Sequence, residues 1–407
     1  MSQASTPDHV EHVLDVDALI DDRSIRILVC CGSGGVGKTT MSAAIGLRAA
    51  ERGRRAVVLT IDPARRLAQS MGLVELDNEP RRVAGVDGSA GGSLDAMALD
   101  MKRTFDEIVE AHSDPERTAA ILANPFYQSL SSSFAGTQEY MAMEKLAQLS
   151  RQAQNEGTWD LIIVDTPPSR SALDFLDAPE RLGSFLDGQF IRVLIVPSRK
   201  GARAGLRVFN AGMGVVSGVL DRILGAQVLE DVRTFASSLD AMFGSFRERA
   251  DATYRMLKEP GTTFVVVSAP EPDALREAAY FVDRLSVDAL PLAGLLVNRV
   301  HRPLTTAITA DAAAAGAERI EAMLVAEPSA EASADDSPED SLRLTSAMLR
   351  LHAESARRFQ REIRLVDRFT AGYESIPVLL VDALAQDVHD LEALRRVGQM
   401  LGSGQPT

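Results

Sequence analysis

One short segment near residue 30 constrains the fold of this chain more than any other. The apolar run RILVCC covers residues 26–31, the glycine-rich sequence GSGGVGKT covers residues 32–39, and a helical pattern continues to residue 52. Gly53 then acts as a helix stop signal. A buried strand, a tight glycine-rich turn and a helix therefore follow one another directly, which is typical of a sheet whose strands are connected by helices.

Further strand signals alternate with helical patterns along the chain. Buried parallel strands separated by helices are typical of α/β proteins with right-handed crossovers. The sequence therefore predicts a doubly wound, mostly parallel sheet. The short apolar runs that we interpret as its other strands lie at residues 56–61, 94–99, 161–164, 263–268, 292–297 and 377–381.

Two long stretches show helical patterns without a convincing strand signal. They cover residues 100–155 and 183–260, and we expect them to form a helical subdomain inserted into the sheet domain. Residues 307–340 are rich in Ala and acidic side chains, which predicts a short helix and a mobile acidic loop. The apolar residues between 341 and 369 recur on one helical face, which predicts a long amphipathic helix.

The remaining domain boundaries follow from these segments. Residues 1–24 are interpreted as an acidic N-terminal tail. The parts assigned to the sheet domain are residues 25–99, 156–182 and 261–306, and the long helix, the last strand and the C-terminal helix share residues 341–407.

Composition and charge exclude several classes of protein. Lys and Arg number 43 against 57 Asp and Glu, a formal charge of −14, whereas nucleic-acid phosphates need a basic surface. No apolar stretch approaches the roughly 20 residues of a membrane helix, and the first 24 residues lack the apolar centre of a signal peptide. The sequence predicts a cytoplasmic protein that is not integral to a membrane and does not bind nucleic acid.

The only two cysteines, Cys30 and Cys31, are adjacent within an apolar run. Neighbouring residues of a strand point to opposite faces, so we expect two small buried side chains and no disulfide. No cysteine pair or cysteine–histidine cluster is spaced to hold zinc.

The sequence GSGGVGKT fits the phosphate-binding pattern GxxxxGK[ST] between a strand and a helix. Its glycines let successive backbone N–H groups point at phosphate oxygens, and the helix N-terminus adds positive potential. Lys38 can reach the β- and γ-phosphates, and the Thr39 hydroxyl can ligate Mg²⁺. The residues that we expect to bind the nucleotide are Gly34, Gly35, Val36, Gly37, Lys38, Thr39 and Thr40.

Two aspartates end strands of the same predicted sheet. Asp165 follows LIIV at the position of an acid that holds Mg²⁺, and Asp62 follows the second strand, where it can orient the attacking water. Asp62 is also suited to cap the following helix, and the two roles are compatible. We therefore expect Asp62 and Lys38 to be catalytic, and Thr39 and Asp165 to bind the metal.

The combination resembles the ArsA-like ATPases, which comprise arsenite-pump subunits and the eukaryotic targeting factor for tail-anchored membrane proteins. The resemblance extends from about residue 26 onward. Within the family, the chain looks most like the actinobacterial subgroup labelled anion-transporting ATPases. Its markers are GSGGVGKTT at 32–40, DPARRL at 62–67, DTPPSRSALDFL at 165–176, LVNR at 296–299 and PVLLVDALAQDVHDLEAL at 377–394.

This resemblance implies a P-loop ATPase in which ATP binding at a dimer interface opens and closes a helical surface. It makes Asp62 the residue that orients water and Asp165 the acid of the second switch. It also makes Asn298 an adenine contact, although such an Asn is otherwise a turn residue, and places Pro270 and Glu271 in the adenine loop.

The sequence departs from the family pattern at three points. Ser33 occupies the position of an early P-loop lysine that contacts the partner's nucleotide, which predicts slow hydrolysis as a homodimer or pairing with a paralogous subunit. With both cysteines beside the loop, a soft-ligand site for arsenite is not available. The paired CxxC motifs that hold the targeting factor's dimer around zinc are also missing from this sequence.

The helical stretches suggest a partner surface. Gly214 and Gly218 form a GxxxG pattern in an apolar setting, and Met141 and Met143 occupy the earlier stretch. They fit either helix packing within the subdomain or a groove for a hydrophobic protein client or membrane-protein partner. The leading hypothesis is thus a dimeric ATP-hydrolysing switch, and the alternative is an ATP-binding scaffold with little turnover of its own.

Overall fold

The computed structural model describes residues 13–61, 65–124, 127–128, 137–167, 248–326 and 338–402. Within them, eight strands form one sheet in the order β3-β4-β2-β5-β1-β6-β7-β8. All neighbouring strands are parallel except β3 and β4. The strands are β1 (Ile27–Gly32), β2 (Arg55–Thr60), β3 (Arg81–Arg82), β4 (Ser93–Ala98), β5 (Leu161–Asp165), β6 (Thr262–Ser268), β7 (Leu292–Val300) and β8 (Val378–Asp382).

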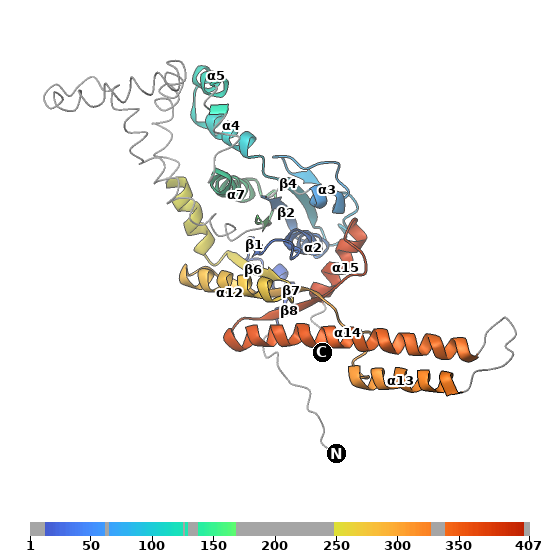
Figure 1. The fold of residues 1–407 in the computed structure, drawn as a ribbon. Coiled ribbons are helices and arrows are strands. Elements are labelled where there is room, and N and C mark those ends of the chain that lie inside the picture. The colour runs from blue at the N-terminus through green and yellow to red at the C-terminus, as the bar shows by residue number, and fades with distance from the viewer. Residues whose placement is uncertain are drawn as a thin grey trace, which may run out of the picture.

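Helices lie on both faces of this sheet (Figure 1). They are α1 (Val16–Asp21), α2 (Lys38–Glu51), α3 (Arg65–Ser70), α4 (Met101–His112), α5 (Pro115–Ala123), α7 (Thr137–Glu156), α12 (Pro272–Val287), α13 (Ala310–Ala326), α14 (Pro338–Gly372) and α15 (Leu391–Gly402). The prediction of a doubly wound, mostly parallel α/β sheet is confirmed.

The central strand β1 divides the hydrophobic core in two, because its side chains alternate between the faces. Leu28 and Cys30 belong to the core that α1, α2 and α15 cover. Val29 and Cys31 belong to the core that α7, α12 and the end of α14 cover. Both thiols are free and buried, as predicted, and burial raises the pKa of Cys30 to about 12.

The N-terminal segment is folded from residue 13 onward, so residues 13–24 do not form the predicted tail, and residues 1–12 lie outside the described residues. Helix α1 begins at its cap Asp15 and contacts α2 and α15. The buried Arg54 donates hydrogen bonds to the backbone oxygens of Ile20 (2.6 Å) and Ile25 (2.7 Å) and to the Asp160 carboxylate (2.5 Å). The acidic pattern of this segment does not indicate a solvated tail, because two of its acids form ion pairs with α2 and its C-cap residue, Asp17 with Arg48 and Asp21 with Arg52.

Helices α4, α5 and α7 occupy the first predicted helical stretch, between β4 and β5. The Asp100 side chain caps α4 by accepting a hydrogen bond from the Arg103 N–H at 2.9 Å. Met141 and Met143 are buried in the core and do not form a surface groove. Residues 248–258 are helical, whereas residues 183–247, including Gly214 and Gly218, lie outside the described residues.

Helices α13 and α14 form a hairpin that extends beyond the edge of the sheet (Figure 1). The long amphipathic helix is confirmed and covers 35 residues. The short helix predicted within residues 307–340 is the 17-residue helix α13, whose alanines favour helix and pack against α14. The mobile acidic loop predicted after this helix falls on residues 327–337, which lie outside the described part of the chain.

Helix α14 is attached to the sheet domain through Glu362. This buried carboxylate accepts a hydrogen bond from the His301 backbone N–H at 2.7 Å and lies 2.8 Å from its ring Nδ1. Arg358, one turn earlier on α14, donates to the same carboxylate at 3.0 Å. The contact between Glu362 and His301 joins α14 to the segment that follows β7.

Candidate functional site

The glycine-rich loop connects β1 to α2 at the edge where the parallel strands end. Gly32 has φ +148°, and a Cβ atom there would lie 2.0 Å from the backbone oxygen of Val267 on β6. Gly37 caps α2 with φ +96°, and a Cβ atom there would lie 2.4 Å from the Asn298 amide nitrogen. Both positions therefore require glycine for backbone conformation and for space.

The glycine-rich loop exposes its backbone to solvent and buries one apolar side chain in the core. Gly34 and Gly35 are exposed, whereas Val36 is buried in the core beneath them. The Lys38 ammonium donates to the backbone oxygens of Gly32 at 2.9 Å and Ser33 at 2.7 Å. The side chain thus curves back across the loop, which places a cation next to backbone N–H groups that suit an anion.

A carboxylate and two hydroxyls meet directly beneath the loop. Asp165 ends β5 next to β1, and its Oδ2 accepts hydrogen bonds from the hydroxyls of Thr39 (2.7 Å) and Thr60 (3.0 Å). Asp165 is only 1% exposed. Oxygen ligands of this kind suit Mg²⁺, and the pair Thr39 and Asp165 is the one that the sequence predicts as metal ligands.

Asn298 lies within β7 rather than in a turn after it. Its Nδ2 donates to the Val36 backbone oxygen at 2.8 Å, and its Oδ1 accepts from the Arg299 backbone N–H at 2.9 Å. The side chain is 7% exposed. Asn298 therefore supports the glycine-rich loop, a contact that sequence reasoning did not anticipate.

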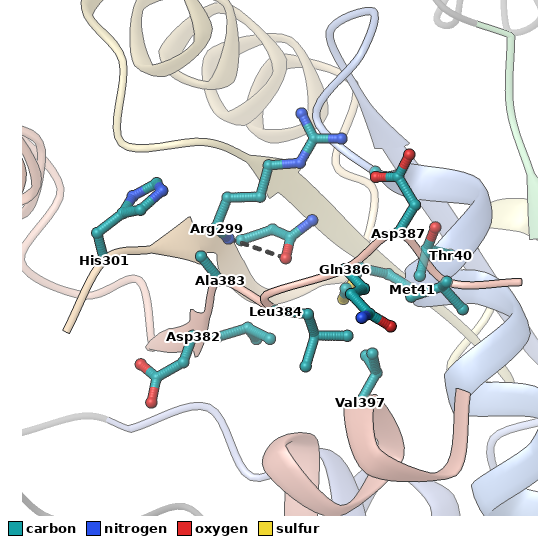
Figure 2. Close-up of a pocket in the computed structure, with 14 residues that line it drawn as sticks. Thr40, Met41, Arg299, His301, Asp382, Ala383, Leu384, Gln386, Asp387 and Val397 are labelled. Atoms are coloured by element: carbon teal, nitrogen blue, oxygen red, sulfur yellow. Dashed lines mark hydrogen bonds between the residues drawn. The ribbon is translucent and has the colours of Figure 1, made fainter. Parts of the chain in front are cut away.

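A cavity of about 190 Å³ opens beside the loop. Its walls are the start of α2, the end of β7 and the loop that follows β8 (Figure 2). Pro270 and Glu271 do not line it, since they lie after β6, where Glu271 precedes the first residue of α12. The lining residues include Thr40, Asn298, Arg299, Asp382, Gln386 and Asp387.

Sequence reasoning missed the loop after β8 as a wall of this cavity. A signal was available, because polar residues after the last parallel strand must lie at the same edge as the glycine-rich loop. The sequence VDALAQD at residues 381–387 fits that rule. Asp62, predicted to orient water, lies outside the described residues, as do all but the first residues of the second switch.

A parallel sheet with a glycine-rich loop between its central strand and a helix, and an acid ending the adjacent strand, defines a P-loop nucleotide-binding protein. Sequence comparison then gives the family: residues 25–307 match the ArsA-type anion-transporting ATPases, and the chain belongs to this family. It is an ATPase, with ATP and Mg²⁺ as the cofactors that the family implies.

Fungal ATPases are among the similar proteins. The chain is 24% identical to ATPase get3 of Neurospora crassa over 297 residues, which cover 73% of this chain and 78% of the fungal protein. It is 25% identical to ATPase GET3 of Malassezia globosa (70% and 76% covered) and 27% identical to ATPase get3 of Aspergillus terreus (71% and 77%). The actinobacterial subgroup stays a prediction.

None of the described helices combines the length and the apolar character that a crossing of the bilayer requires.

Proposed function

We propose that this ATPase is a dimeric nucleotide switch whose helical surface binds a protein partner. The single observation that carries the nucleotide part is the contact of Asp165 with Thr39 beneath the loop, at 2.7 Å. It brings an acid from one strand and a hydroxyl from the P-loop helix to one point, as phosphoryl transfer to water requires.

In this proposal, the backbone from Gly34 to Thr40 holds the phosphates. Thr39 and Asp165 would hold Mg²⁺, which would supply charge neutralisation at the phosphates. Lys38 leaves the loop oxygens that it now contacts and moves toward the phosphates. Asp62 orients the attacking water.

Asn298 and the cavity beside it accommodate the adenine. Support comes from the position of the cavity, which begins at Gly37 and Thr40, where the phosphate loop ends. Pro270 and Glu271 remain predicted contacts without support from this geometry.

Assembly and client binding are inferred from the family resemblance. We propose a homodimer, or a heterodimer with a paralogous ATPase subunit, that acts in the cytoplasm on a hydrophobic protein client or membrane-protein partner. Ser33 supports the heterodimer, because an uncharged side chain there cannot provide the cation that the family places next to the partner's nucleotide.

The test of the nucleotide site is calorimetric titration with Mg-ATP, together with steady-state phosphate release. Lys38→Ala and Asp165→Asn should each reduce turnover by at least about 100-fold, because charge stabilisation is the main catalytic contribution in phosphoryl transfer. The exposed Lys258→Ala is the matched control and should leave turnover unchanged. Failure of the wild type to bind ATP or ADP would overturn the proposal.

The second candidate, an ATP-binding scaffold with little turnover, is favoured by Ser33 alone. Ser33→Lys should raise the hydrolysis rate of the homodimer by at least about tenfold if the missing cation limits turnover. An unchanged rate in this variant would rule out that explanation. Rapid wild-type turnover without a paralogue would exclude the scaffold.

A further inference from the structure

Arg299 has an unusual backbone conformation at the wall of the cavity. Its φ is +63°, and among the described residues only Ala289 shares a positive φ without being glycine. The left-handed conformation costs a residue with a side chain about 1 kcal/mol or more, and such strain concentrates at ligand sites. Asn298 stabilises the conformation by accepting the Arg299 backbone N–H.

The conformation coincides with an irregularity in the sheet. The pairing of β7 with β8 is regular up to Val297 and resumes at Val300 with a shift in register. A bulge re-aims the side chains of the residues that it contains. Here Asn298 turns to the glycine-rich loop, while Arg299 comes to line the cavity (Figure 2).

Arg299 is also a cation without an ion pair among the described residues. Its neighbour Arg302 is different, since it pairs with Asp382 at 3.1 Å and lies over the Phe359 ring. The Arg299 side chain is exposed and shares the cavity wall with Asp387. A planar guanidinium that is weakly hydrated and not engaged by a carboxylate is well suited to stack on an aromatic ring.

We propose that Arg299 packs its guanidinium against the base of the bound nucleotide and sets the affinity for the nucleoside end of the ligand. The inference rests on the proposed nucleotide site. With phosphates at the glycine-rich loop, the nucleoside end extends past Gly37 and Thr40 into the cavity that Arg299 lines. Asn298 fixes the position of Arg299 relative to the glycine-rich loop, because its amide binds both the Val36 backbone oxygen and the Arg299 N–H.

The experiment compares two ligands by calorimetry on the full chain, Mg-ATP and Mg-tripolyphosphate, which lacks a base. Arg299→Ala should weaken ATP binding about 3- to 10-fold, in line with cation–π energies, and change tripolyphosphate binding by less than about twofold. Arg299→Lys should recover less than half of the loss, because an ammonium does not stack as a plane. Arg276→Ala, at an exposed site on α12, is the control and should change neither affinity.

Arg299→Gly distinguishes the effect of losing the side chain from the effect of backbone strain. Glycine adopts this φ freely, so the variant should be more stable than Arg299→Ala and yet bind ATP equally weakly. Wild-type-like ATP binding by Arg299→Gly would overturn the proposal, as would an equal loss for both ligands, which would indicate a phosphate contact. If the wild type binds neither ligand, the nucleotide site itself is wrong.

Discussion

The glycine-rich loop and the α13–α14 hairpin are stabilised in different ways. The loop follows a fully buried strand at the centre of the sheet, and single atoms decide its shape, such as the missing Cβ of Gly32. The hairpin lies after residue 307, where the family match ends. There, two helices pack through small residues and surface ion pairs.

The two regions also differ in what they expose. The loop exposes backbone, whereas α14 exposes the apolar side chains of Leu344, Met348 and Leu351, each at least 60% exposed. The interior of the hairpin is formed by Ala313, Ala317 and Ala353. We therefore expect single substitutions in the glycine-rich loop to cost much stability. In the hairpin, we expect most substitutions to cost little, except those that separate α13 from α14.

The largest effect is expected for Gly32→Ala. A Cβ atom 2.0 Å from the Val267 oxygen forces β1 or β6 to move, and the positive φ adds strain. We expect a loss of about 3 kcal/mol or more in the free energy of unfolding, together with loss of ATP binding. Urea unfolding and calorimetry measure the two.

The matched control for Gly32 belongs to the hairpin helix. Gly372 ends α14, and nothing lies within 4 Å of a Cβ atom there. Gly372→Ala should change stability by less than about 0.5 kcal/mol. If both glycine substitutions cost the same, the contrast between the two regions is wrong.

Ala317→Leu should have an intermediate effect that is confined to the hairpin. Ala317 is completely buried against α14, so the larger side chain separates the helices at a cost of about 1–3 kcal/mol. Hydrogen exchange should increase in α13 and α14, while the affinity for ATP stays unchanged. Ala315→Leu, on the exposed side of α13, is the control, and a loss of ATP binding in Ala317→Leu would show that the regions are coupled.

The smallest effect is expected at Glu321. Its hydrogen bond with Arg350 and that with Ser346 lower the pKa of this carboxyl from 4.5 to about 2. A lowered pKa means that the ionised form favours the folded state, so its stabilisation is present above pH 4.5 and lost as the pH falls toward 2. Glu321→Gln should therefore be slightly less stable than wild type at pH 7, with the difference vanishing near pH 2.

Thermal unfolding of both proteins across this pH range measures the difference. Glu318→Gln, on the same helix at an exposed residue, should show a smaller difference from wild type at pH 7. A difference for Glu321→Gln that does not depend on pH would contradict the assignment to ionisation.

Much of the sheet could be predicted from the sequence, because buried parallel strands are nearly continuous apolar runs. The glycine-rich loop and the acid at the end of β5 were predictable for the same reason: their chemistry requires those residues at fixed positions relative to strands. The contact between Thr39 and Asp165, 126 residues apart, follows once β1 and β5 are adjacent.

Other features could not be predicted from local pattern. Sequence periodicity does not indicate that β7 contains a bulge at Arg299 or that Asn298 turns to the Val36 oxygen, since both depend on the register between strands. Asp17 and Asp21 resembled the acids of a solvated tail because their arginine partners lie 31 residues later. Composition alone does not distinguish paired charges from solvated ones.

Because Glu362 attaches α14 to the sheet domain, the exposed apolar residues of the hairpin lie far from this attachment. Leu344 lies 18 residues before that anchor, which corresponds to roughly 27 Å of helix at 1.5 Å per residue. His301, held by the anchor, lines the cavity beside the glycine-rich loop. By the same geometry, a tilt of α14 by about 5° at Glu362 would displace Leu344 by roughly 2 Å.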